Sequence, residues 1–144
     1  MMIAIGCDHA GYELKETIKE YFDKNGIAYT DFGTYGTESV DYPVYAKKVC
    51  ASIQTGESDV GILVCGTGIG MSIAANKQKN IRAACCTDTY GAKMTRLHND
   101  ANVLALGSRI TGPGLALDIV KQFLSTEFEG GRHSGRVSMY DDLV

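Results

Sequence analysis

A cysteine beside a glycine-rich loop is the first feature of this sequence that could carry chemistry. Residues 63–72 read LVCGTGIGMS, so Cys65 ends an apolar run and three glycines follow at alternate positions. The loop matches neither the P-loop pattern nor the dinucleotide-binding pattern G-x-G-x-x-G, whose sixth position is Met71 here. Asp88, about twenty residues further on, keeps the dinucleotide alternative open. The stretch predicts a strand-to-helix turn whose backbone N–H groups suit an anion or an oxyanion.

Cys65 lies immediately before this turn, at the expected N-terminus of a helix. The thiolate is the reactive form of cysteine, and a helix N-terminus favours it. Thr67 is placed to hydrogen-bond the sulfur, and the loop amides could stabilise the oxyanion that forms when a base removes a proton beside a carbonyl. The alternative is a buried core cysteine at a strand end. We favour the chemical interpretation because base and oxyanion donors fall within one turn.

Two further stretches carry polar side chains of the types that bind sugars and phosphates. Asp8 and His9 follow an apolar run near the N-terminus. Asp8 could simply cap a helix with His9 in solvent, but beside Cys65 we expect Asp8 to bind a sugar hydroxyl and His9 a phosphate. Arg132 and Arg136 stand in the segment RHSGR, where two arginines are either solvated or act as a forked pair that suits a phosphate monoester.

Alternating strands and helices must position these residues. Val- and Ile-rich runs predict strands at 2–7, 27–33, 59–65, 81–86 and 102–107. Helical periodicity predicts helices near 11–25, 43–55, 68–78, 89–98 and 113–126. Five β-α units with short connections predict an α/β fold in which a parallel sheet lies between two helix layers. We expect residues 1–144 to form a single domain, with 127–144 as a C-terminal extension that includes a short helix.

The candidate residues fall at opposite edges of this sheet. Ligands of such sheets bind beyond the carboxyl ends of the strands, where Asp8, Cys65 and Arg109 are expected to meet. His98 and Asn99 lie between a helix and the next strand, at the amino edge, and a strand of this length spans roughly 17–20 Å. Either His98 is an ordinary cation at a helix C-terminus, or a two-fold dimer joins the amino edge of one chain to the carboxyl edge of the other.

Composition bounds the class of protein. The net charge of −3 argues against nucleic acid or an anionic membrane as a partner. No apolar run approaches the roughly 20 residues of a membrane span, and the N-terminus lacks the basic region of a signal peptide, so we expect a cytoplasmic protein. The five cysteines show no zinc-type spacing, and we expect no metal site.

The motifs GCDHAG, DYP, CGTGIG, HNDANVLALGSR and RHSGR together resemble type B ribose-5-phosphate isomerases, of the ribose/galactose isomerase family, along the whole chain. The resemblance implies a Rossmann-like three-layer αβα sandwich that converts ribose 5-phosphate to ribulose 5-phosphate, in the non-oxidative branch of the pentose phosphate pathway. The reaction would pass through an enediolate without metal or organic cofactor. The resemblance also implies a homodimer, often paired into a tetramer, with shared active sites and with residues 127–144 extending to the partner subunit.

The resemblance further implies a role for each matching residue. Cys65, supported by Thr67, would take the C2 proton, and the amides from Gly66 through Thr67, Gly68 and Ile69 to Gly70 would stabilise the enediolate. His98 would be the acid that opens the furanose ring, with Asp8 as its helper. The other expected substrate contacts are Tyr42 and Asn99 to sugar hydroxyls, His9, Arg132 and Arg136 to phosphate, and Arg109 as a further binding arginine.

Two alternatives stay open. One is an isomerase of a six-carbon sugar phosphate, such as allose 6-phosphate or galactose 6-phosphate, because an extra carbon needs only a slightly roomier pocket. The other is a non-catalytic module that binds a phosphosugar or a nucleotide. Such a module would keep its ligand after Cys65→Ala and would have no reaction to lose.

Overall fold

Apolar strands alternate with amphipathic helices along the chain. The computed structural model describes residues 1–144. The elements are β1 (Ile3–Cys7), α1 (Tyr12–Lys24), β2 (Tyr29–Asp31), α2 (Tyr42–Gln54), β3 (Val60–Cys65), α3 (Ile69–Asn76), β4 (Ala83–Cys85), α4 (Thr89–Asn99), β5 (Val103–Gly107), α5 (Pro113–Ser125), α6 (Arg132–Ser138) and the 3-10 helix η1 (Met139–Leu143). This order confirms the predicted α/β fold.

The five strands form one parallel sheet in the order β2-β1-β3-β5-β4. The register pairs Cys7 with Val64 and Cys65 with Gly107. The ends of the three central strands therefore lie side by side at the carboxyl edge, which is where the sequence places its reactive side chains.

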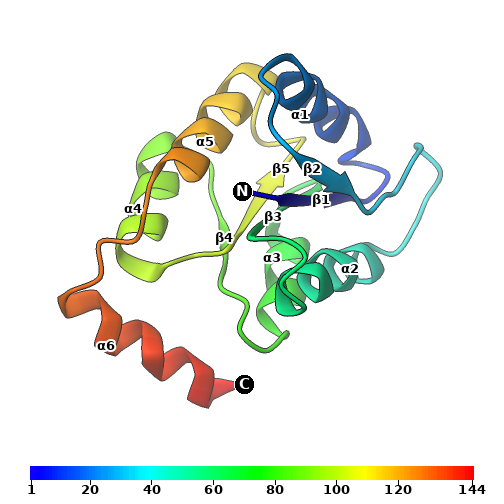
Figure 1. Ribbon diagram of the computed structural model, residues 1–144. Helices are drawn as coiled ribbons and strands as arrows, with labels where there is room; N and C mark the ends of the chain where they lie inside the picture. The colour runs from blue at the N-terminus through cyan, green and yellow to red at the C-terminus, as the bar shows by residue number, and fades with distance from the viewer.

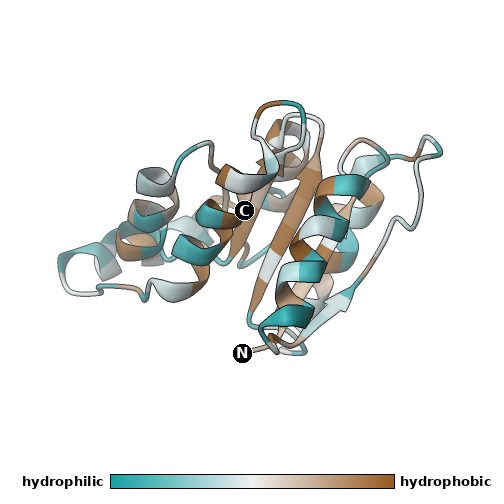
Figure 2. Cartoon of the chain, turned by 90° about the horizontal axis from the view of Figure 1, so that it is seen from above, coloured by the Kyte–Doolittle hydropathy of each residue, from teal (hydrophilic) through white to brown (hydrophobic).

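Helices cover both faces of the sheet and make the three-layer sandwich that the sequence predicts. α1 and α5 lie on one side with α4, and α2 and α3 lie on the other (Figure 1). Alternate strand residues point to the two sides, so Ile3 and Ile5 join one core cluster while Ala4 joins the other. Figure 2 shows the central strands as continuously hydrophobic, as expected where a sheet is buried on both faces.

α2 packs unusually close to the sheet because two strand residues have no side chain. A Cβ atom added at Gly6 would lie 2.9 Å from one methyl group of Val49. A Cβ atom added at Gly61 would lie 2.7 Å from the other methyl group of the same side chain. This close packing fixes α2 against β1 and β3, and with it Tyr42, the first residue of the helix.

Two strands are shorter than predicted. The predicted strands 27–33 and 81–86 contract to Tyr29–Asp31 and Ala83–Cys85, because each lies at a sheet edge and pairs with a single neighbour over three residues. α3 also ends at Asn76 rather than at 78. The Asn76 side chain there donates to the carbonyl of Ala83 and accepts from its N–H, at 2.9 and 2.8 Å, which ties the helix end to β4.

The chain ends in an extension beyond the sandwich. α6 and η1 project from the body of the molecule, next to the end of α4 (Figure 1). None of the helices is both long and apolar enough to cross a membrane.

A fully buried lysine ties α1 to the strand at the sheet edge. The Lys15 ammonium lies 2.7 and 2.9 Å from the two carboxylate oxygens of Asp31 and 2.6 Å from the carbonyl oxygen of Thr34. Lys19 contacts the same carboxylate at 2.8 Å, and the N–H of Gly33 donates to it at 2.8 Å. Burial alone would raise the pKa of Asp31, but these hydrogen bonds outweigh it and hold the pKa below its ordinary value.

The Asp31 carboxylate is therefore expected to make stability depend on acid pH. Its folded-state pKa is depressed, so its contribution is complete above the unfolded value of about 3.9 and is lost as the pH falls through the folded value. Urea unfolding of the wild type and of Asp31→Asn should give a free-energy difference that is constant from pH 7 to pH 5 and shrinks below about pH 4. A difference that stays constant down to pH 3 would contradict the depressed pKa.

Candidate active site

Main-chain hydrogen bonds join the three reactive strand ends into one unit. The N–H of Asp8 donates to the carbonyl of Val64 at 3.1 Å. The N–H of Ser108 donates to the carbonyl of Cys65 at 2.9 Å, and that of Arg109 to the carbonyl of Gly66 at 3.0 Å. The structure thus brings Asp8, Cys65 and Arg109 to neighbouring positions at the carboxyl edge.

The Cys65 sulfur lies at the N-terminus of α3, where it accepts a hydrogen bond from the N–H of Gly68 at 3.1 Å. Gly68 has φ 77°, a left-handed conformation that favours glycine, and this conformation closes the turn beneath the sulfur. The sequence predicts a hydrogen bond between the Thr67 side chain and the Cys65 sulfur, which the structure does not show. The Thr67 hydroxyl instead accepts from the N–H of Ile69 at 3.3 Å. The sulfur thus faces a backbone donor at a helix N-terminus, which is the kind of surrounding in which reactive cysteines are found.

The other cysteines have different surroundings. Burial raises the pKa of Cys50 to about 12 and is the main cause that raises the pKa values of Cys7 and Cys86 to about 11. Burial also raises the pKa of Cys85, whose thiol donates to the carbonyl of Thr67 at 3.6 Å. Cys65 is the only cysteine whose sulfur accepts a hydrogen bond from a main-chain N–H.

Asp8 and His9 are both held in place by main-chain donors. Asp8 is buried, and its Oδ1 accepts from the N–H of Gly11 at 3.0 Å. Asp8 does not cap α1, whose N-cap is Gly11 without a side-chain cap hydrogen bond, so the capping alternative is wrong. The hydrogen bond instead closes the turn before the helix, and the second carboxylate oxygen of Asp8 accepts none within the chain. His9 is only half exposed, and its Nδ1 accepts from the N–H of Val40 at 3.1 Å. The His9 imidazole is thus held by a main-chain hydrogen bond and is not a freely solvated side chain.

An aromatic ring and a guanidinium flank the glycine loop. A Cβ atom at Gly70 would lie 2.8 Å from Cζ of Tyr42, so glycine at this position lets the phenol lie against the loop. A Cβ atom at Gly66 would lie 3.3 Å from Nη1 of Arg109. Arg109 also lines a cavity of about 360 Å³ between the first turns of α1 and α5. A thiol, a phenol and a guanidinium therefore lie against the glycine loop, and the carboxylate of Asp8 and the imidazole of His9 follow the end of the neighbouring strand β1.

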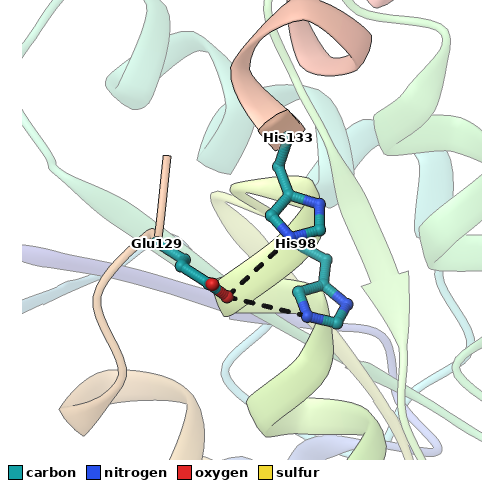
Figure 3. A group of neighbouring side chains, drawn as sticks. All are labelled: His98, Glu129 and His133. Atoms are coloured by element: carbon teal, nitrogen blue, oxygen red, sulfur yellow. Dashed lines mark ion pairs between the residues drawn. The ribbon is translucent and has the colours of Figure 1, made fainter. Parts of the chain in front are cut away.

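The remaining candidates gather at the amino edge, around His98 at the C-terminal end of α4. The His98 ring stacks on that of His133, with centroids 4.3 Å apart and planes 17° from parallel. The Glu129 carboxylate lies beside both rings, and its Oε2 is 3.8 Å from each Nε2 (Figure 3). Glu129 and His133 are not among the residues predicted from the sequence, although His133 lies between the two arginines of the RHSGR motif.

Three of these side chains offer ligand atoms that lie within 4.8 Å of one another, so the cluster could be considered as a metal site. Its geometry argues against this. The nearly parallel rings do not direct their nitrogen lone pairs to one point, and the Nε–H of Arg132 donates to Nε2 of His133 at 3.4 Å. Burial, together with His98 and Arg132, lowers the pKa of His133. The arrangement suits a hydrogen-bonded ionic cluster better than a tetrahedral zinc centre.

An ion-pair network fixes the end of α4 that carries His98. Asp100 ends the helix with φ 47°, and its carboxylate contacts Arg82 at 3.2 Å and Arg96 at 3.1 Å. Arg96 also donates to the carbonyl of Thr126 at 3.2 Å, which ties the start of the C-terminal extension to α4. The network holds His98 and the extension together at the amino edge.

The two groups of candidates do not meet within one chain. No hydrogen bond or ion pair joins Asp8, His9 or Cys65 to the cluster around His98. Asn99, which donates to the Tyr140 hydroxyl at 3.3 Å, instead lines the largest cavity, of about 880 Å³, between α3, β4 and the C-terminal extension. This separation agrees with the edge argument from the sequence.

Comparisons with known proteins agree with the motifs. The family model described as Ribose/Galactose Isomerase matches residues 3–140. Ribose-5-phosphate isomerase B of Escherichia coli is 50% identical over 135 residues, which cover 94% of this chain and 91% of the relative. D-erythrulose-4-phosphate isomerase of Pectobacterium atrosepticum is 46% identical over 138 residues, which cover 95% of this chain and 91% of the relative.

A solved structure, that of ribose-5-phosphate isomerase B from Clostridium thermocellum, superposes with a TM-score of 0.98 at 55% identity, covering 99% of this chain and 97% of that one. The resemblance seen in the motifs is thus confirmed over nearly the full length. The chain belongs to the ribose/galactose isomerase family and is a sugar-phosphate isomerase.

Proposed function

We propose that this chain is a cytoplasmic aldose–ketose isomerase that interconverts D-ribose 5-phosphate and D-ribulose 5-phosphate with Cys65 as its base. The observation that carries the proposal is the hydrogen bond from the Gly68 N–H to the Cys65 sulfur, 3.1 Å long, at the start of α3. It places the sulfur beside a row of backbone donors at a helix N-terminus, in a family whose members are named as isomerases of phosphorylated sugars.

The chemistry needs one base and one set of oxyanion donors. In the open-chain aldehyde the carbonyl acidifies the C2–H bond, and the Cys65 thiolate removes that proton and returns it to C1. A second proton passes from the C2 hydroxyl to the C1 oxygen, so the atoms balance. The amides from Gly66 to Gly70 stabilise the intervening enediolate. A general base contributes about 10²–10⁴-fold to such a rate, and each oxyanion donor about 10²–10³-fold.

The remaining candidates bind the sugar and open its ring. His98 acts as the acid that opens the furanose, with the free oxygen of Asp8 as its helper. Tyr42 and Asn99 contact sugar hydroxyls. The phosphate is bound by the side chains of His9, Arg132 and Arg136, and Arg109 is a further contact to the substrate.

We propose that a second copy of the chain completes the site. Ile69 and Ile73 of α3 are 56% and 58% exposed, and Leu143 and Val144 of the C-terminal extension are 79% and 63% exposed. Ile73, Leu143 and Val144 line the 880 Å³ cavity, and a lone chain would leave all four apolar side chains in water. A two-fold homodimer would cover them, extend residues 127–144 to the partner and set the amino edge of one chain against the carboxyl edge of the other.

Proton NMR in D₂O tests the reaction and the substrate together. Ribose 5-phosphate should give ribulose 5-phosphate with deuterium entering the sugar, faster than D-erythrulose 4-phosphate, allose 6-phosphate or galactose 6-phosphate reacts. Faster turnover of another sugar would replace the substrate and keep the isomerase. Binding without turnover of any of the four would leave a binding module and would overturn the proposal.

The two arginines of α6 are expected to act on the phosphate. Arg132→Met and Arg136→Met should each raise KM for ribose 5-phosphate about 10- to 100-fold, because each removes charge-assisted hydrogen bonds to an anion, while kcat changes little. Steady-state kinetics check this against Lys121→Met, which removes a half-exposed cation of α5 and should leave KM unchanged. An unaltered KM in both arginine variants would show that these two arginines do not bind the phosphate of the substrate.

A further inference from the structure

The segment from Gly33 to Asp41 is attached to the residues on both sides of Asp8. At its start the carbonyl of Gly33 accepts from the N–H of Cys7 at 2.6 Å, and the N–H of Thr34 donates to the carbonyl of Cys7 at 2.8 Å. At its end the N–H of Val40 donates to Nδ1 of His9 at 3.1 Å. The segment is therefore hydrogen-bonded to the last residue of β1, Cys7, and to His9 two residues later.

The start of this segment is fixed by the buried ammonium described above. Lys15 donates to the carbonyl of Thr34 at 2.6 Å, and the Asp31 carboxylate that neutralises Lys15 accepts from the N–H of Gly33 at 2.8 Å. The middle of the segment is exposed, whereas Val40 is half buried. The segment is thus anchored at its start, and just after Val40 it enters α2, whose N-cap is Asp41, so both of its ends are fixed independently of His9.

The hydrogen bond to His9 determines where the imidazole carries its proton. A ring nitrogen that accepts a hydrogen bond carries none, so neutral His9 has its proton on Nε2. No group of the chain accepts a hydrogen bond from this Nε2. The Nε2–H is consequently a free donor at the carboxyl edge, of the kind that a phosphate oxygen accepts.

We propose that Val40 is a positioning residue for phosphate recognition: its main-chain N–H holds His9 as the Nε2–H tautomer and leaves that N–H to donate to the phosphate of the substrate. The inference deepens the proposed function and rests on it for the identity of the sugar. It assigns the Gly33–Asp41 segment a task that none of its side chains performs.

The variant Val40→Pro removes this N–H, and Val40→Ala keeps it while removing most of the same side chain. Val40→Pro should raise KM for ribose 5-phosphate about tenfold with kcat within about twofold, since a donor loses its orientation while the base is untouched. Val40→Ala should match the wild type. Equal KM values for the two variants would overturn the proposal.

NMR of the protein labelled with ¹⁵N-histidine tests the tautomer without relying on a variant that must fold. The chain has three histidines, so the His9 signals are assigned from their loss in His9→Gln. In the wild type and in Val40→Ala, the His9 proton should reside on Nε2, and inorganic phosphate should shift that resonance. A proton on Nδ1, or no response to phosphate, would overturn the proposal.

These readouts separate this inference from the proposed function. An Nε2–H that responds to phosphate in a protein without turnover of ribose 5-phosphate would sustain the role of Val40 and refute the substrate. Full turnover of ribose 5-phosphate with the proton on Nδ1 would do the reverse.

Discussion

Cys65→Ala is expected to lower kcat for ribose 5-phosphate by about 10³-fold, because it removes the general base of the proposed mechanism. Binding should survive, since Cys65 is 5% exposed and the phosphate contacts lie on other elements. Deuterium exchange into unreacted ribose 5-phosphate should disappear together with turnover. Titration calorimetry of the variant with ribose 5-phosphate and steady-state kinetics of both proteins measure the two effects.

Cys85→Ala is the matched control for that result. Cys85 lies beside the same loop, and its sulfur is 3.0 Å from the position that a Cβ atom would take at Gly68. Its thiol donates a hydrogen bond and its pKa is raised, so its removal should leave kcat within about twofold. Retention of a tenth or more of the wild-type rate by Cys65→Ala would assign the base to another group and keep the isomerase.

Mixing two inactive proteins is expected to restore activity. In the proposed shared site, Cys65→Ala retains a functional amino edge and His98→Asn a functional carboxyl edge. If each site combines one edge from each subunit, a mixed dimer contains one intact site and one site that lacks both groups. Random exchange makes about half of the dimers mixed, so about a quarter of the wild-type activity should return.

The experiment requires subunit exchange to be demonstrated independently, for example with two tags that co-purify only from the mixture. The control mixes Cys65→Ala with the double variant Cys65→Ala/His98→Asn, which cannot form an intact site in any combination. Recovery in the first mixture alone supports the shared site. Demonstrated exchange without recovery would falsify it, because a site within one chain gains nothing from mixing.

Regular elements were predictable from the sequence because a sheet buried on both faces leaves a strong local pattern. The run Val60–Cys65 is apolar at nearly every position, and the structure buries all six residues. Edge strands were less predictable, since β2 and β4 pair on one side over three residues and carry less of that pattern. The convergence of the reactive strand ends followed from topology alone, because parallel strands end at the same edge.

The finer geometry of the site was beyond sequence reasoning. Gly68 rather than Thr67 donates to the Cys65 sulfur, because a left-handed glycine turns its N–H inward, and no pattern of residue types reveals that rotation. The contact between His98 and His133 joins residues far apart in the chain, and it depends on where the C-terminal extension folds back. Local periodicity carries no information about either contact.

The C-terminal extension helps to line the 880 Å³ cavity, and this bears on where a fused tag would disturb the protein. Leu143 and Val144 line the 880 Å³ cavity together with Asn99. A purification tag fused after Val144 would therefore begin at the mouth of that cavity, whereas one placed before Met1 would begin beside Asp59 and Asn102, in a smaller depression. Kinetic work on this enzyme is best done with the tag at the N-terminus, or with a C-terminal tag removed by a protease.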